Sequence, residues 1–259
     1  MIRAICCVPV SPLRAEPSHR TEMVSQLLFG ECCEILDQTG RDWYRVRVDY
    51  DGYEGWCQPA QLTEIDEKDL EGTGYALTPE WVTALEYNGH PMMVPMGCQL
   101  TAMKNGLALW RKNQVRYKGK IWDPGGAATD PKAILQLTFK FLNTPYLWGG
   151  RSVFGIDCSG FTQMIFKFLG VSLLRDAYLQ AGQGEPVGFL EETRTGDLAF
   201  FDNEEGRITH VGILLNSHEI IHSSGKVRID KIDNMGILQS ETFQRTHHLR
   251  VIKRLLAEK

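Results

Sequence analysis

The stretch P-Y-L-W-G-G-R-S-V-F-G-I-D-C-S-G-F, from Pro145 to Phe161, decides the fold of the C-terminal half. After Cys158, apolar residues recur at helical spacing until Gly170 closes the run: Phe161, Met164, Ile165 and Phe168. The pattern predicts an amphipathic helix with Cys158 near its N-terminus. The positive end of a helix dipole favours a thiolate, the nucleophilic form of cysteine. Cys158 is therefore a candidate nucleophile.

Two histidines follow in segments that have the character of strands. T-H-V-G-I-L-L places His210 in one strand, and E-I-I-H-S-S-G places His222 near the end of the next. Adjacent antiparallel strands can bring the two together, with His210 as general base and His222 as the group that orients it. A lone cysteine or histidine is more often structural than catalytic. The combination of a helix start with both strands is what predicts a thiol–imidazole site.

The segments around this site predict an α+β domain over residues 129–259. Thr129, Asp130 and Pro131 carry the signals of a helix start in T-D-P-K-A-I-L-Q-L-T-F-K-F-L. Strands are expected at D-L-A-F-F, T-H-V-G-I-L-L, E-I-I-H and L-R-V-I-K-R-L. A helical half followed by an antiparallel β half is typical of the α+β class.

The N-terminal half has the pattern of short strands separated by turns. Apolar and charged side chains alternate in Y-R-V-R-V, and Asp51-Gly52 then supplies a hairpin turn. We expect a small barrel over residues 1–65 and a second small β module over residues 66–128. An acidic linker, Glu64 to Gly74, is expected between them.

Composition excludes several classes of protein. The 259 residues carry a net charge of -4 without a Lys/Arg-rich run, which gives no sign of a nucleic-acid partner, and no apolar stretch is long enough for a membrane span. The seven cysteines include no C-x-x-C pair, so we expect all but Cys158 to be small buried hydrophobes. No feature indicates a metal or an organic cofactor. We expect a monomer.

Several motifs together resemble a known family. P-Y-L-W-G-G…D-C-S-G-F, G-D-L-A-F-F, H-V-G-I and I-I-H-S-S are similar to the NlpC/p60 wall peptidases, over roughly residues 130–255. L-R-A-E-P, Q-L-L-F-G-E and D-G-Y-E-G-W resemble bacterial SH3 modules. The resemblance implies a papain-like catalytic domain preceded by two small all-β SH3-like barrels. It also implies Cys158 as nucleophile, His210 as base and His222 as the third polar residue.

Within that family, the layout is similar to the γ-D-glutamyl-L-diamino acid endopeptidases. Those enzymes cut between γ-D-Glu and the diamino acid of a murein peptide whose L-Ala amine is free. Asp176, in L-L-R-D-A-Y, matches the position where members with this specificity carry an aspartate for that amine. Its alternative role is to cap the next helix. Trp148 and Ser159 match pocket positions, with a turn residue and a helix cap as the respective alternatives.

The resemblance further implies that the first SH3-like module closes one end of the cleft. Tyr53, in D-G-Y-E-G-W, and Glu22, before Q-L-L-F-G-E, are the candidate residues. The alternatives are packing in a barrel turn for Tyr53 and a solvated charge for Glu22. Asp157 is a further candidate for substrate binding, although capping of the catalytic helix is the favoured role.

The expected function is hydrolysis of the γ-D-Glu–diamino acid bond of murein peptides with a free N-terminal L-Ala, in cell-wall peptide recycling. Three alternatives stay open: a secreted endopeptidase on polymeric peptidoglycan, a Cys-His acyltransferase or amidase, and a non-catalytic wall-binding protein. The start M-I-R-A-I-C-C has too short an apolar run for a signal peptide. We therefore expect a cytoplasmic location, or a periplasmic or secreted one if a leader was removed.

Overall fold

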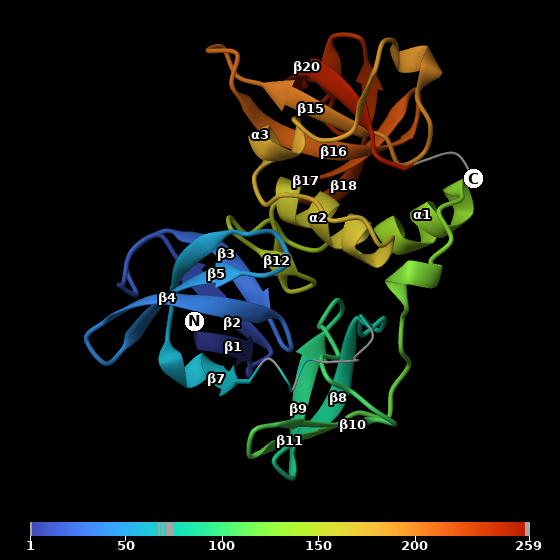
Figure 1. Cartoon of the computed structure of the whole chain (residues 1–259). Helices are drawn as coiled ribbons and strands as arrows, with labels where there is room; N and C mark the ends of the chain where they lie inside the picture. Colours follow the sequence, from blue (N-terminus) through green and yellow to red (C-terminus); the bar gives the residue numbers. More distant parts are fainter. Residues whose placement is uncertain (1, 67, 69, 71–74, 257–259) are drawn as a thin grey trace. The chain divides into compact units, whose positions relative to one another are not determined.

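The computed structural model describes residues 2–66, 68, 70 and 75–256. The chain divides into two compact units (Figure 1). The first consists of Met1–Gly126 with Trp148–Val153, and the second of Ala127–Leu147 with Phe154–Lys259. The acidic linker predicted over Glu64–Gly74 lies largely outside the described residues. In the part of the chain that is described, no helix has the length and apolar character needed to cross a bilayer.

The first unit is built from two antiparallel sheets (Figure 1). Its larger sheet has seven strands in the order β3-β2-β6-β5-β4-β1-β7: β1 (Ile2–Cys6), β2 (Val10–Arg14), β3 (Met23–Leu28), β4 (Cys32–Thr39), β5 (Trp43–Val48), β6 (Glu54–Cys57) and β7 (Leu62–Ile65). Its smaller sheet has four in the order β10-β11-β8-β9: β8 (Val82–Tyr87), β9 (His90–Pro95), β10 (Leu107–Trp110) and β11 (Asn113–Arg116). Single 3-10 turns cover Pro59–Gln61 and Pro124–Gly126.

The predicted pattern of β5 is confirmed, but two closed barrels are not seen. Val46 and Val48 are buried while Arg45 and Arg47 are exposed, and β5 pairs with β6 across the turn at Gly52. Both sheet orders are linear, and the outer strands β3 and β7, which are fully described, do not pair with each other. Strand β3 instead lies beside β12 (Arg151–Ser152).

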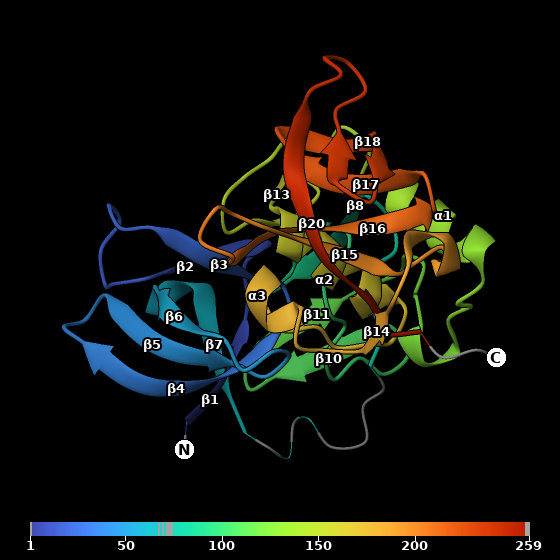
Figure 2. The same cartoon turned by 90° about the horizontal axis from the view of Figure 1, so that it is seen from above.

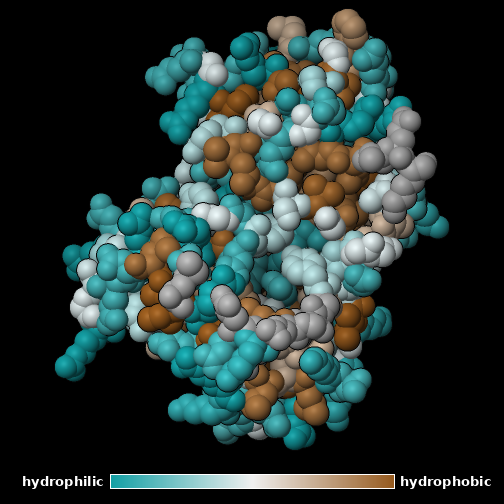
Figure 3. All heavy atoms as spheres, viewed as in Figure 1, coloured by the Kyte–Doolittle hydropathy of each residue, from teal (hydrophilic) through white to brown (hydrophobic). Residues whose placement is uncertain are grey.

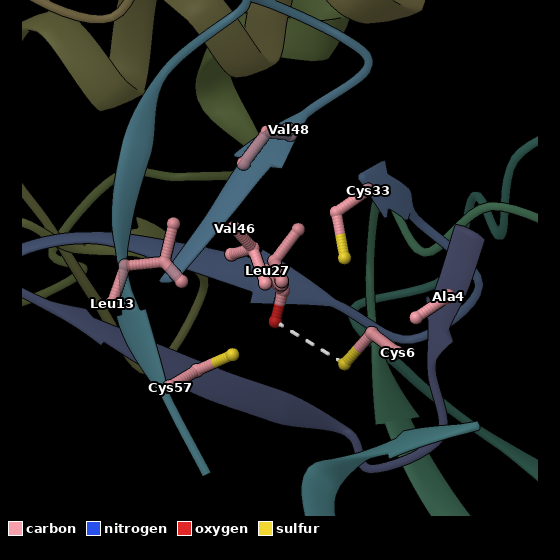
Figure 4. Packing of buried hydrophobic residues seen from close by; sticks show 8 residues of the cluster. All are labelled: Ala4, Cys6, Leu13, Leu27, Cys33, Val46, Val48 and Cys57. Atoms are coloured by element: carbon pink, nitrogen blue, oxygen red, sulfur yellow. Dashed lines mark hydrogen bonds between the residues drawn. The ribbon is translucent and has the colours of Figure 1, made fainter. Parts of the chain in front are cut away.

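The core of the first unit is formed by side chains from its larger sheet. Figure 4 shows the buried cluster, in which three of eight members are cysteines: Ala4, Cys6, Leu13, Leu27, Cys33, Val46, Val48 and Cys57. Burial raises the pKa of Cys57 to about 12, so its thiol is neutral at physiological pH and packs as a small apolar group. All seven cysteines are buried and unbridged.

The segment Trp148–Val153 follows the predicted first helix of the catalytic domain in sequence, yet it folds within the first unit. Arg151, which is 1% exposed, donates to both carboxylate oxygens of Glu31 at 2.9 and 3.1 Å. It also bonds Gln26, through that residue's carbonyl at 2.6 Å and its side-chain oxygen at 2.8 Å. Gly149 has φ +74, and a Cβ there would lie 2.2 Å from the carbonyl oxygen of Met23. These contacts fix the segment against β3.

The second unit combines helices with one large antiparallel sheet (Figure 1). The sheet order is β14-β20-β15-β16-β17-β18-β19, and β19 also pairs with β20. Six of the strands therefore close into a barrel, with β14 attached outside. The bounds are β14 (Glu185–Val187), β15 (Leu198–Asp202), β16 (Ile208–Asn216), β17 (Glu219–Ser224), β18 (Lys226–Asp233), β19 (Gly236–Leu238) and β20 (Arg245–Arg254), with a short strand β13 (Gly155–Ile156) before the helix that follows.

Apolar side chains fill this barrel and the space between it and the helices. The cluster within the sheet consists of Leu190, Ala199, Phe201, Leu214, Ile220, Ile232, Ile237 and Ile252. Helix α2 (Cys158–Phe168) packs on β16 and β17, with α1 (Pro131–Phe139) and α3 (Ala177–Gln180) beside it (Figure 2). A 3-10 turn covers Leu190–Glu192. In the space-filling view, apolar side chains also reach the surface near these helices (Figure 3).

Both predicted helix starts are confirmed. Asp130 caps α1 by accepting the backbone N–H of Ala133 at 3.0 Å, and Pro131 occupies the first helical position. The eleven residues of α2 are all buried, so the helix has no exposed face and the prediction of an amphipathic surface helix is corrected: its polar residues Thr162 and Gln163 are hydrogen bonded in the interior. The strand predictions for the C-terminal half correspond to β15, β16, β17 and β20, whereas β14, β18 and β19 were not predicted.

Candidate active site

Cys158 is the first residue of α2, and the residue before it caps the helix. The carboxylate of Asp157 accepts the backbone N–H of Gly160 at 2.7 Å. The Cys158 side chain is 7% exposed. Helix α2 packs on β16, and the backbone N–H of Val211, the residue that follows His210, acts to lower the pKa of the thiol. The thiol therefore lies beside β16 at the level of His210.

His210 and His222 lie on neighbouring strands, and their rings are hydrogen bonded. Nε2 of His210 is 2.8 Å from Nδ1 of His222, with the rings nearly perpendicular at 85°. Gly212 permits this approach: it pairs with His222 across the strands, and a Cβ at residue 212 would lie 2.8 Å from the Cβ of His222. Because Nε2 of His210 is engaged, Nδ1 is the ring nitrogen left for the thiol.

A carboxylate that the sequence reasoning missed lies behind His222. Nε2 of His222 is 3.0 Å from Oδ2 of Asp230, which is 1% exposed. Asp230 also accepts Nη2 of Arg228 at 3.1 Å and the backbone N–H of Ser240 at 2.8 Å. Burial opposes ionisation, but these hydrogen bonds outweigh it and hold the pKa of Asp230 well below its ordinary value. Asp230 is therefore a buried anion at neutral pH.

The thiol and the imidazole are both neutral in the resting site. Burial, and then the charge of Asp157, raise the pKa of Cys158 to about 12, although the backbone N–H groups of Ser159 and Val211 oppose the rise. Burial lowers the pKa of His210 well below its ordinary value, and the neighbouring imidazoles lower it further. The helix dipole favours a thiolate at Cys158, as predicted from the sequence, but burial of the side chain opposes it and is the larger influence on the pKa. Ionisation of the thiol requires transfer of its proton.

A third imidazole covers the candidate base. His247 of β20 stacks on His210 with ring centroids 4.0 Å apart and an interplanar angle of 29°. Burial, and then the imidazole of His222, lower the pKa of His247 to about 4. The ring of His210 is therefore stacked on that of His247 and hydrogen bonded to that of His222. Within the described residues, no group of three or more histidine, cysteine or acidic side chains is placed to hold a metal ion.

Acidic pH is expected to destabilise the second unit through these rings. An unfolded histidine titrates near pH 6.5, whereas His210, His222 and His247 resist protonation when folded. The unfolded chain binds more protons between the folded and unfolded pKa values, so the free energy of unfolding decreases as the pH falls below about 6.5. For each ring that stays neutral in the folded state, the free energy of unfolding decreases by up to about 1.4 kcal/mol per pH unit.

Calorimetric unfolding between pH 7 and pH 4.5 measures this slope. His247→Phe keeps a stacked ring but removes one titrating group, so its slope should be smaller than that of the wild type. Gln244→Asn, at an exposed position of the same unit, removes no titrating group, serves as the control and should keep the wild-type slope. A stability that does not change over this range would contradict the assignment of neutral buried rings.

Asp157 and Ser159, two predicted substrate-binding residues, are joined by a buried arginine. Arg175 donates to both carboxylate oxygens of Asp157, at 3.1 and 2.5 Å, and to Oγ of Ser159 at 2.9 Å. All three residues are at most 6% exposed. The geometry shows the alternative role of Asp157, which is helix capping. The cluster fixes the start of α2, and Arg175 was not predicted.

Asp176, the predicted receiver of an amine, directly follows Arg175. It stands at the N-cap position of α3, but its side chain makes no capping hydrogen bond. It is half-buried. The alternative role of capping is thus not performed by its carboxylate.

The other three predicted substrate-binding residues belong to the first unit. Nε1 of Trp148, which is 60% exposed, donates to Oε1 of Glu22 at 2.6 Å. This pair brings together two residues that are 126 positions apart in sequence. The half-buried Tyr53 lies in the turn between β5 and β6, where its backbone N–H bonds Oδ1 of Asp51 at 3.0 Å.

The second unit thus holds a buried thiol at the start of α2, and a hydrogen-bonded imidazole pair and carboxylate on the sheet against which this helix packs. A thiol whose proton can pass to an adjacent imidazole can attack a carbonyl carbon and form an acyl-enzyme. This is the site of a thiol hydrolase.

Comparison with known proteins defines the family. The model of the NlpC/P60 family matches residues 143–246, which include Cys158, His210 and His222. The model of the bacterial dipeptidyl-peptidase Sh3 domain matches residues 13–62. The chain belongs to the NlpC/P60 family and is a cysteine peptidase with an N-terminal bacterial SH3 domain.

Similarity extends over most of the chain. A γ-D-glutamyl-L-lysine dipeptidyl-peptidase of Bacillus subtilis is 33% identical over 221 residues, 77% of this chain and 71% of the relative. A protein of the same name from Bacillus cereus is 30% identical over 233 residues, 80% of this chain and 68% of the relative. The crystal structure of an NlpC/P60 family protein from Bacillus cereus has a TM-score of 0.81 at 21% identity and covers 97% of this chain and 99% of its own. The fold is therefore shared along the chain.

Proposed function

We propose that the protein hydrolyses the bond between γ-D-Glu and the diamino acid of murein peptides with a free N-terminal L-Ala. The observation that carries the proposal is the hydrogen-bonded pair His210–His222 on the two strands against which the helix of Cys158 packs, in a chain similar to γ-D-glutamyl-L-lysine dipeptidyl-peptidases. The diamino acid is lysine or diaminopimelate. Small recycled murein peptides are the proposed substrates.

The reaction begins with proton transfer from the Cys158 thiol to Nδ1 of His210. The sulfur attacks the γ-carbonyl carbon of the D-glutamyl residue, and the negative charge moves to the carbonyl oxygen. When the carbon–nitrogen bond breaks, the imidazolium of His210 returns its proton to the leaving amine of the diamino acid. Water then gives a proton to the same imidazole while its oxygen attacks the acyl carbon. The carbon–sulfur bond breaks, L-Ala-D-Glu is released, and the imidazolium returns the proton to the sulfur, which restores the neutral thiol. His222 holds the ring of His210 throughout.

Recognition of the free amine is assigned to Asp176. Asp176 stands where family members with this specificity carry an aspartate, and a half-buried carboxylate can accept charge-assisted hydrogen bonds from an ammonium group. Trp148 and Glu22 form one hydrogen-bonded unit and, with Tyr53, are the residues proposed to limit the substrate to a short N-terminal segment. Acetylation of the substrate removes its positive charge and adds bulk, so both features would reject it.

Asp176→Asn is expected to reduce kcat/KM for L-Ala-γ-D-Glu-L-Lys by about 30- to 100-fold. Loss of one partner of a hydrogen-bonded charge pair costs about 2 kcal/mol or more. Hydrolysis of the N-acetylated peptide, already weak, should change little, so the ratio of the two rates falls. Liquid chromatography with mass detection measures both. The control is Glu191→Gln, which removes an exposed carboxylate of the same unit and should leave the ratio unchanged.

The outcome also separates the alternative functions. If the wild type cleaves free and acetylated peptides equally, the amine requirement is wrong and a general wall endopeptidase is favoured. If hydroxylamine or another amine captures the acyl group and water does not, an acyltransferase is favoured.

A further inference from the structure

The hydrogen-bonded chain behind the candidate base ends at the ionised carboxylate of Asp230. This charge can determine which ring nitrogens of the two histidines carry a hydrogen. From the thiol outward, the groups are His210, His222 and Asp230, with ring contacts of 2.8 and 3.0 Å. Asp230 lies on β18, outside every motif that the family resemblance uses. We infer that Asp230 is a positioning residue that fixes the tautomers of both histidines so that Nδ1 of His210 is the proton acceptor. The inference deepens the proposed function and rests on His210 being its base.

The carboxylate of Asp230 acts only as a hydrogen-bond acceptor. It accepts Nη2 of Arg228 at 3.1 Å and the backbone N–H of Ser240 at 2.8 Å, and Nε of Arg228 forms an ion-pair contact with Oδ2 at 2.9 Å without hydrogen-bond geometry. An ionised carboxylate can only accept hydrogen bonds. Nε2 of His222 must therefore carry the hydrogen of the 3.0 Å contact.

The tautomer of His222 in turn determines the tautomer of His210. A neutral imidazole carries one N–H, so a His222 protonated at Nε2 offers a lone pair at Nδ1. The 2.8 Å contact then requires the hydrogen to be on Nε2 of His210. The only lone pair of His210 is left on Nδ1, where a thiol proton can be taken. No proton needs to move along the chain when His210 becomes an imidazolium, because its Nε2–H already points to His222.

The opposite assignment would disable the site. Were Nδ1 of His222 to carry the hydrogen, it would donate to Nε2 of His210, and neutral His210 would be protonated at Nδ1. The thiol would then meet an N–H group in place of a lone pair. Both arrangements satisfy the 2.8 Å contact equally well, and the charge of Asp230 distinguishes them. In serine peptidases, an isosteric loss of charge behind the base favours the wrong tautomer and lowers kcat by about 10⁴-fold.

Asp230→Asn tests the inference, because the amide keeps the shape and can donate to Nε2 of His222. With ¹⁵N-labelled histidine, long-range proton–nitrogen spectra of the full chain report the tautomer of each ring. The wild type should show His210 and His222 protonated at Nε2, and the variant should shift both toward Nδ1. The kcat should fall by about 10²- to 10⁴-fold, with a smaller change in KM.

Two controls separate this role from a purely structural one. Asp233→Asn removes an exposed carboxylate of the same strand that also pairs with an arginine, and it should change neither tautomers nor kcat. Arg228→Met breaks the ion pair but leaves Asp230 against His222, so the Nε2–H tautomers should persist. Folding of each variant is checked by circular dichroism.

The tautomer readout needs no substrate, so it is independent of the peptide that the enzyme cleaves. Retention of both Nε2–H tautomers in folded Asp230→Asn would overturn the inference even if kcat fell. Conversely, failure of L-Ala-γ-D-Glu-L-Lys as a substrate, with the predicted tautomer change intact, would overturn the proposed function alone.

Discussion

Replacement of Cys158 by alanine is expected to lower kcat by about 10⁴- to 10⁶-fold, the loss seen when the nucleophile of a comparable hydrolase is removed. No acyl-enzyme can form without the sulfur, and the neutral imidazole of His210 has no thiol proton to accept. The side chain is small and packs at the start of α2, so the folded structure should persist. Peptide binding should be retained, because the carboxylates assigned to recognition are unchanged.

A matched control is available in the same chain. Cys32 and Cys158 are both unbridged and both 7% exposed, but Cys32 belongs to the first unit. Cys32→Ala should therefore keep wild-type turnover, while any general effect of losing a buried thiol appears in both variants. Turnover of a murein tripeptide, normalised to folded protein, provides the measurement. Wild-type activity in Cys158→Ala would exclude Cys158 as the nucleophile.

The largest expected loss of stability follows from Arg151→Met. The substitution leaves the carboxylate of Glu31 buried, at 1% exposure, without its cation. Breaking a buried ion pair in this way costs about 3–5 kcal/mol. Removing both charges, in Glu31→Leu with Arg151→Met, should recover much of the loss, because no unpaired charge is then buried.

Tryptophan fluorescence in a urea titration measures this effect selectively. All six tryptophans of the chain lie in the first unit, so their emission reports its unfolding. Arg45→Met removes an exposed partner of Glu54 and should cost less than about 1 kcal/mol. If Arg151→Met is no more destabilising than this control, the segment Trp148–Val153 is not fixed by its buried ion pair.

Local patterns predicted the catalytic helix and its neighbouring strands because the signals are short-range. The helix that starts at Cys158 shows itself by apolar spacing and a capping residue, and the strand of His210 by a run of β-branched and apolar residues. The closure of the second sheet into a barrel depends on the pairing of β19 with β20, which no local period encodes. The N-terminal modules were wrongly predicted to be closed barrels, because the sequence likewise does not show which distant strands pair.

Asp230 was missed because β18 was not predicted: its apolar residues do not keep one alternation, since Val227 and Ile229 have one parity and Ile232 has the other. Asp230 shares the parity of the buried Ile232, and only the folded strand shows that this position is buried. The burial that raises the pKa of Cys158 could not be predicted either, because a helix dipole is a local property whereas desolvation depends on the whole fold. Similarly, nothing near Trp148 in sequence indicates that its partner is Glu22.

The most direct test of the central claim is identification of the products formed from L-Ala-γ-D-Glu-meso-diaminopimelate and from L-Ala-γ-D-Glu-L-Lys. Mass spectrometry of timed reactions with wild type and Cys158→Ala provides the answer. The account predicts that the wild type releases L-Ala-D-Glu and the free diamino acid from at least one peptide, and that Cys158→Ala releases neither. Cleavage between L-Ala and D-Glu, or no cleavage of either peptide by folded wild type, would contradict it.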